Sequence, residues 1–122
     1  MKLLTRPRAI VAVDDELDIL TAPYLARRLA PVARAGNDLV LDLSAVRFCD
    51  CAGLTAFLRL RRLASASGGS LRLAAPTAAV SRVIMLAHLE EVLPLAASVD
   101  EAISTLGTDP AIMPAVRTLG GP

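Results

Sequence analysis

Hydrophobic and polar residues alternate along the chain in blocks that predict strands and helices in turn. Short apolar runs at residues 9–13, 39–43, 71–75 and 92–95 are the candidate strands, because polar or turn residues bound each of them. Between these runs, apolar residues recur at spacings of three and four, which is typical of amphipathic helices. The pattern therefore predicts four strand-helix units, with a further strand expected over residues 3–8.

Capping residues and glycines set the limits of the four predicted helices. The limits are Thr21 with Pro23 to Gly36-Asn37, about residue 52 to Gly68-Gly69, Pro76-Thr77 to the neighbourhood of His88, and the capping box Ser98 with Glu101 to Gly107. This alternation predicts an α/β fold with a mixed sheet of four to five strands and about four helices.

One domain accounts for the whole chain. Its 122 residues, 54% of them apolar, are enough to bury a core without covalent cross-links. We expect the domain to cover residues 1–107. Residues 108–122 contain three prolines and a Gly-Gly pair, so we expect them to form a flexible tail.

The most informative stretch runs from Val40 to Thr55, because it joins the most apolar strand to the best helix through a short polar turn. Asp50-Cys51-Ala52-Gly53 should lie where the carboxyl end of that strand meets the helix, which is where open α/β sheets carry their functional surface. Asp42, within the strand, is expected to brace loop amides. The helix is apolar over more than half its circumference, so it is either engulfed by the fold or docks a partner.

Composition excludes several classes of function. Aromatic residues make up only 2% of the chain, which leaves little for base stacking. The net charge is +1, and acidic and basic residues are balanced in both halves of the sequence, so no footprint for nucleic acid or an anionic membrane is expected. No apolar run of 18 residues exists. We expect a cytoplasmic protein without membrane insertion.

Catalytic motifs are also missing from the sequence. His88 is the only histidine, and no nucleophile elbow, P-loop or dinucleotide fingerprint is present. The acidic cluster from Asp14 to Asp18 is typical of a solvated turn rather than of a magnesium site. We therefore expect no enzyme activity, no catalytic residues, no metal and no cofactor.

The two cysteines are Cys49 and Cys51, whose spacing suits a disulfide poorly. A reduced pair is expected. Cys51 precedes the predicted helix, where the helix dipole would stabilise a thiolate, so we regard it as a candidate reactive thiol. The alternative is a small side chain that fills space beside Cys49.

The stretch Val40-Leu-Asp-Leu-Ser-Ala-Val-Arg-Phe-Cys-Asp-Cys-Ala-Gly-Leu resembles the central motif of STAS domains, the sulfate-transporter and anti-sigma-factor-antagonist family. That family's pattern is an apolar strand ending Asp-Leu-Ser, a spacer, and Asp-Ser-Ser/Thr-Gly-Leu. The resemblance continues through Asp15-Glu16-Leu17-Asp18 with Thr21-Ala22, residues 68–73 and Val92-Leu93-Pro94, and covers roughly residues 8–106. It implies a STAS-like fold.

The stand-alone proteins of this family bind an anti-sigma factor kinase, and phosphorylation of the Ser after the motif Asp breaks the complex. That position is Cys51 here, and the next is Ala52, so neither hydroxyl of the family motif is present. The resemblance implies an anti-sigma factor or a related kinase-fold protein as partner, and no control by phosphorylation at the usual place. The docking residues that it implies are Glu16, Asp18, Asp50, Cys51, Ala52, Gly53, Leu54 and Thr55.

Two alternatives stay open. STAS proteins that lack the acceptor Ser also occur as subunits of lipid-transport ABC assemblies. Oxidation of Cys51 to a sulfinic acid would add negative charge where a phosphate would have been, which would make the protein a redox-responsive regulator. A homodimer is compatible with either function.

Overall fold

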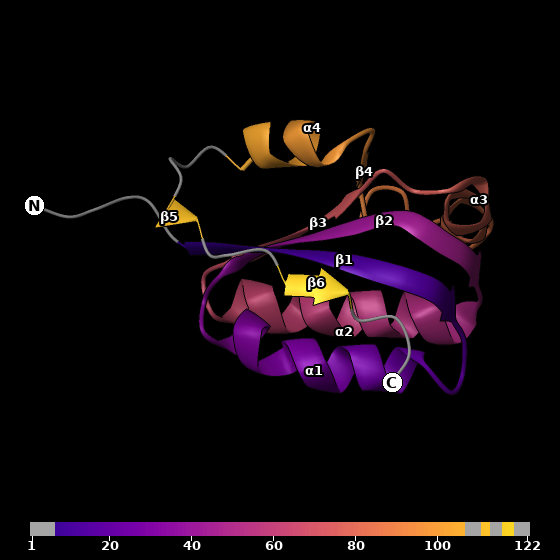
Figure 1. Cartoon of the computed structure of the whole chain (residues 1–122), viewed down its shortest axis with the longest axis horizontal. Coiled ribbons are helices and arrows are strands. Elements are labelled where there is room, and N and C mark those ends of the chain that lie inside the picture. Colours follow the sequence, from indigo (N-terminus) through magenta and orange to yellow (C-terminus); the bar gives the residue numbers. More distant parts are fainter. Residues whose placement is uncertain (1–6, 107–110, 113–115, 119–122) are drawn as a thin grey trace, which may run out of the picture.

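The computed structural model describes residues 7–106, 111–112 and 116–118. A parallel sheet lies between two helices on one face and one helix on the other, and a further helix packs near the carboxyl ends of the central strands (Figure 1). The strands are β1 (Pro7–Leu17), β2 (Asp38–Cys49), β3 (Ser70–Ala74), β4 (Leu95–Ala96), β5 (Ala111–Ile112) and β6 (Val116–Thr118). The helices are α1 (Ala22–Arg34), α2 (Cys51–Ala66), α3 (Ala78–Leu86) and α4 (Val99–Ser104).

The sheet has the order β4-β3-β2-β1, and both β5 and β6 pair with β1. Because β2 occupies one side of β1, β5 and β6 together fill a fifth position on the other side. The prediction of an α/β fold with four helices is confirmed. The expected mixed character is not seen, because every strand pair among the described residues is parallel.

The segments β5 and β6 belong to the predicted tail, and their pairing with β1 attaches them to the sheet. The remaining residues of that tail lie outside the described residues, so its flexibility stays a prediction. The predicted strand over residues 3–8 also lies mostly outside them, with only Pro7 and Arg8 described, as the first residues of β1.

The two central strands are longer than their apolar runs predict. We expected the first to end at Val13 and the second at Leu43, but β1 runs to Leu17 and β2 to Cys49. The extensions pair with each other, with Leu17 opposite Cys49, through register shifts between Ala12 and Asp14 and between Asp15 and Glu16. These irregularities break the alternation by which a strand is recognised.

The main core lies between the sheet and the α1–α2 layer, and α3 also contributes to it. Its largest side chains, including Phe57, Leu41 and Leu60, are fully buried. A smaller core of Val40, Ala74, Ala96 and Ala102 lies between the sheet and α4. β2 is therefore covered on both faces, which explains its continuous apolar run. Asp42 accepts a hydrogen bond from the Ser44 amide at 3.0 Å, and this amide belongs to β2 and not to a loop as expected, because the strand continues to Cys49.

The predicted helix starts are confirmed, although one is capped differently. Ser98 and Thr77 accept hydrogen bonds from Glu101 N and Val80 N, at 3.0 and 3.4 Å. Thr21 makes no such bond to α1. Gly36 and Gly68, with φ of 85° and 90°, lie in the left-handed region just beyond α1 and α2, where glycine costs least.

Two other boundaries differ from the sequence prediction. The last strand was expected at residues 92–95, but β4 is Leu95–Ala96. Leu93, only 2% exposed, enters the core from outside any strand, which accounts for the apolar run. His88 lies beyond α3 rather than within it, with a positive φ of 58°.

We expect Thr77→Val to lower the free energy of unfolding by about 1–2 kcal/mol. The Thr77 hydroxyl caps α3 and also donates a hydrogen bond to the Val46 carbonyl at 2.7 Å. The substitution removes both bonds, and with them the link between α3 and the extension of β2. Urea denaturation checks this. Thr77→Ser, which keeps both bonds, should retain most of the stability, and an equal loss in the two variants would contradict the assignment.

Candidate docking surface

The predicted site lies at the carboxyl ends of β1 and β2, where the β1–α1 loop meets the first turn of α2. We call this region the docking end and define it as residues 16–21 and 48–55. The Asp50 amide donates to the Leu17 carbonyl at 3.2 Å and so ties the two segments together. The sequence prediction that Asp50-Cys51-Ala52-Gly53 lies between a strand end and a helix start is confirmed.

Gly53 brings α2 directly onto the ends of the two strands. A Cβ at this position would lie 2.6 Å from Cys49 Sγ and 3.0 Å from Leu17 Cβ, closer than packed atoms come. Gly53 is buried, and its φ is not positive. Its role is thus internal: the missing side chain lets the helix start next to both strands.

Asp18 organises the loop on the other side of the docking end. Its Oδ1 accepts hydrogen bonds from Leu20 N at 2.9 Å and Thr21 N at 3.0 Å. The Thr21 hydroxyl donates to the Glu16 carbonyl at 2.6 Å, which closes the loop back onto β1. The amides of Thr21 and Leu20 hold the pKa of the Asp18 carboxyl below its ordinary value of 3.8.

Asp50 caps α2 by accepting a hydrogen bond from Ala52 N at 2.9 Å. Cys51 is the first residue of the helix, and its side chain is exposed. The Thr55 hydroxyl donates to the Cys51 carbonyl at 2.9 Å, within the same helix. Cys51 is therefore the side chain that the start of α2 presents outward, at the end of the helix where the dipole favours negative charge.

The two cysteines have different surroundings. Cys49 is 4% exposed and packs beneath Gly53. Burial, followed by the nearby charges of Asp50 and Cys51, raises the pKa of the Cys49 thiol to about 11. Cys49 is thus an inert space-filling thiol, and Cys51 is the accessible one.

Large apolar side chains are exposed around the docking end, and the sequence analysis missed them. Ile19 and Leu20 in the β1–α1 loop are 75% and 82% exposed, and Phe48 at the end of β2 is 47% exposed. Met85 and Leu86 are exposed on α3, which lies at the same end of the sheet (Figure 1). The signal for the first pair was an apolar dipeptide between two loop-forming residues, Asp18 and Thr21.

The structure brings all eight predicted docking residues together but does not expose all of them. Glu16, Cys51 and Thr55 are exposed; Asp18, Asp50 and Ala52 are half-buried. Gly53 and Leu54 are buried, so they support the surface from beneath. A partner that binds without rearranging this end would touch the first six and the apolar side chains beside them.

Within residues 7–106, 111–112 and 116–118, no cluster of three or more His, Cys, Asp or Glu side chains is arranged to hold a metal ion. In the same part of the chain, no helix has the length and apolar character needed to cross a membrane.

The family model of the STAS domain matches residues 1–102. The chain therefore belongs to the STAS domain family.

Particular proteins resemble the chain in sequence or in fold. The anti-sigma-B factor antagonist of Bacillus subtilis is 30% identical over 87 residues, which are 71% of this chain and 80% of that protein. The crystal structure of an anti-sigma factor antagonist from Mycobacterium paratuberculosis superposes with a TM-score of 0.69 at 29% identity, covering 79% of this chain and 85% of that one. The STAS domain of a SulP transporter from Vibrio cholerae has a TM-score of 0.63 at 17% identity, covering 85% and 83%. This last likeness shows the fold alone.

We expect Gly53→Ala to destabilise the protein by about 1–3 kcal/mol, although alanine is the better helix former. The added Cβ would press on Cys49 Sγ and Leu17. Cys49→Ala in the same chain removes the closest contact, so the double variant should recover part of the loss, with a coupling energy of at least about 0.5 kcal/mol in urea denaturation. Additive losses would show that the two residues do not meet.

Iodoacetamide at neutral pH should label Cys51 in the folded protein and Cys49 only after unfolding. Equal labelling of both thiols at neutral pH would contradict this assignment.

Because the folded pKa of Cys49 is raised, its contribution to stability is fully present below the unfolded value of about 9.0 and is lost as pH rises through about 11. The free energy of unfolding should therefore fall across that range, and less so in Cys49→Ala.

Proposed function

We propose that the protein is a non-catalytic STAS regulator whose docking end binds an anti-sigma factor or a related kinase-fold protein. Its binding is not controlled by phosphorylation at the family's usual position. The membership of the STAS family and the likeness to anti-sigma factor antagonists support the class of partner.

The observation that carries the proposal is the cluster of exposed apolar side chains at the docking end. Ile19 and Leu20 in the β1–α1 loop and Phe48 at the end of β2 are exposed on backbone that hydrogen bonds hold in place. Large apolar side chains exposed on a rigid surface are typical of a protein interface. Their burial drives association, and a rigid surface loses little conformational freedom on binding. Asp18 and Glu16 supply polar groups at the rim of this surface.

The absence of a phosphate acceptor follows from the side chains at the start of α2. Cys51 is not a substrate for a Ser/Thr kinase, and Ala52 has no hydroxyl. The nearest hydroxyl along the helix, on Thr55, donates to the Cys51 carbonyl. Partner binding is then expected to be set by concentration or by another signal.

Affinity purification from the native cell, followed by titration of the purified kinase-fold partner, tests the proposal. Leu20→Asp places a charge in the apolar cluster, and Cys51→Asp imitates a phosphate at the start of α2. Both should weaken binding at least about tenfold, because each would bury an unpaired charge. Both substituted side chains are exposed, so the fold should survive, as circular dichroism would establish.

Ser104→Ala on α4 is the control. This exposed residue lies outside the docking end, on the face of the sheet away from α1 and α2 (Figure 1). Its affinity should equal that of the wild type. The proposal fails if the docking-end variants bind as tightly as the control. Incorporation of phosphate into the wild-type chain near Cys51 by the partner and ATP would overturn the statement on phosphorylation.

A second candidate is a STAS subunit of a transport assembly such as a lipid-transport ABC assembly, since the chain shares its fold with the STAS domain of a SulP transporter. Co-purification with an ATPase subunit instead of a sigma regulator would support that function. The exposure of Cys51 favours a third, redox control of docking. Peroxide treatment that leaves Cys51 unmodified by mass spectrometry and binding intact would exclude it.

A further inference from the structure

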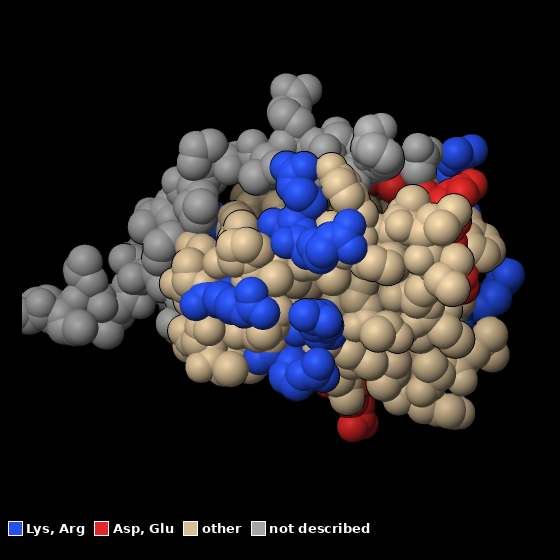
Figure 2. All heavy atoms as spheres, turned by 90° about the horizontal axis from the view of Figure 1, so that it is seen from below, with Lys and Arg blue, Asp and Glu red and all other residues tan. Residues whose placement is uncertain are grey.

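The outer face of the α1–α2 layer is strongly basic, although the net charge of the whole chain is only +1. Each helix carries three exposed arginines, and neither carries a single acidic residue. Figure 2 shows the Lys and Arg side chains gathered in the middle of this face, with Asp and Glu mostly at its edge. Among the described residues, the acidic ones belong to β1, β2, the loops and α4.

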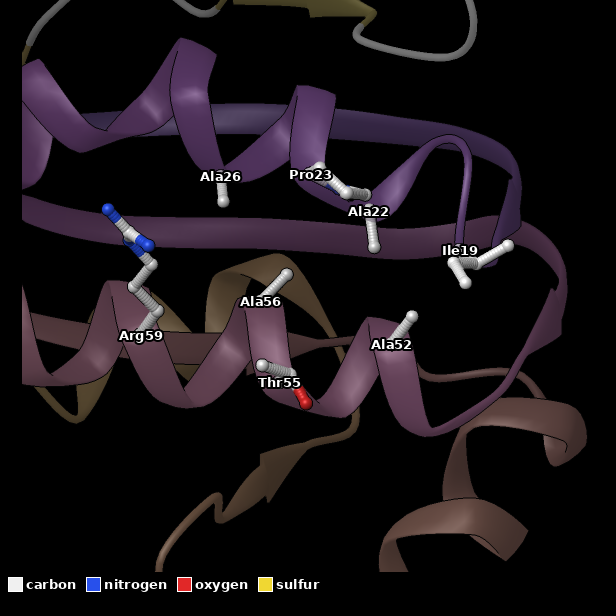
Figure 3. A pocket seen from close by; sticks show the side chains of 8 residues that line it. All are labelled: Ile19, Ala22, Pro23, Ala26, Ala52, Thr55, Ala56 and Arg59. Atoms are coloured by element: carbon white, nitrogen blue, oxygen red, sulfur yellow. The ribbon is translucent and has the colours of Figure 1, made fainter.

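A groove of about 320 Å³ runs between the two helices. Figure 3 shows that the alanines of both helices point into it, with Ile19 at one end and Arg59 at the other. Its lining residues are Ile19, Ala22, Pro23, Ala26, Ala52, Thr55, Ala56 and Arg59. The alanines pack against one another across the helix contact, with Ala22, Ala26 and Ala56 only 2–8% exposed, so the groove is shallow and its floor is apolar.

The arginines differ in how they relate to this groove. Arg59 lines it directly, whereas Arg61, two residues on, lines a separate hollow with Ser65 and Glu91. Arg28 is engaged with Tyr24, whose hydroxyl accepts a hydrogen bond at 2.8 Å. Arg62 follows Arg59 by three residues on α2, so the two share a side of the helix.

We propose that the α1–α2 groove binds an amphipathic helix of a protein partner that has one apolar stripe and acidic residues on its flanks. The apolar stripe would fill the groove above the alanine floor, and the carboxylates would pair with Arg59 and the exposed arginines beside it. A groove between two helices, with small side chains along it, admits a third helix at close range. Paired charges at the rim fix its position.

This surface goes beyond the proposed function, because a helix can bind the groove whether or not a kinase-fold protein docks at the strand ends. The apolar floor of the groove favours an acidic protein helix over an anionic lipid bilayer or a nucleic acid duplex. A lipid bilayer or a nucleic acid duplex would use the charge and leave the alanine floor unfilled. The low aromatic content likewise offers nothing for stacking with bases.

Fluorescence anisotropy with a synthetic helix of about 18 residues tests the proposal. The probe carries Leu and Ala in one stripe with Glu on both flanks. It should bind the wild-type chain, and binding should weaken as salt screens the charges. Arg59→Glu, which reverses the charge at the end of the groove, should weaken binding about tenfold.

Arg61→Glu is the matched control, since it changes the charge of α2 equally but faces the other hollow. It should lower affinity much less than Arg59→Glu. Equal losses in the two variants, or equal binding of a Lys-flanked or stripe-scrambled peptide, would overturn the proposal. Binding to phosphatidylglycerol vesicles or duplex DNA but not to the peptide would also overturn it. None of these outcomes bears on the docking end, which is tested with the kinase-fold partner and Leu20→Asp.

Discussion

The close approach of α2 to the ends of β1 and β2 is the constraint on which the rest of the structure depends. It exists because Gly53 has no side chain to hold the helix away from Leu17 and Cys49. With the helix in this position, Asp50 can cap it while its own amide bonds back to β1. Cys51, the first residue of the same helix, is thereby placed at the carboxyl ends of the two strands.

The molecule separates its charges over two surfaces of opposite character. The docking end combines apolar side chains with the acidic residues Glu16, Asp18 and Asp50. By contrast, all the charged residues of α1 and α2 are arginines. Because Ile19 and Ala52 border both, the surfaces adjoin at one end of the groove. A chain with a net charge of only +1 thus presents one acidic and one basic surface.

The elements with local signals could be predicted from the sequence. The capping box at Ser98 and the turn at Thr77 gave correct helix starts, and the strand-turn-helix stretch was correctly located between β2 and α2. The extensions of β1 and β2 could not, because their pairing depends on register shifts that destroy the alternation of Val46 and Cys49 with their neighbours. The groove was equally out of reach, since it arises from the contact of two helices far apart in sequence. Charge counts along the chain also average over faces that only the fold separates.

Cys51 stands at the first position of a helix, where the backbone dipole welcomes negative charge. A charge gained there would be felt by a bound protein while costing this fold little. A single base change converts a cysteine codon into a serine codon. One base therefore separates this thiol from a hydroxyl at the same exposed position of the helix, and the exchange would leave the packing around Gly53 unchanged.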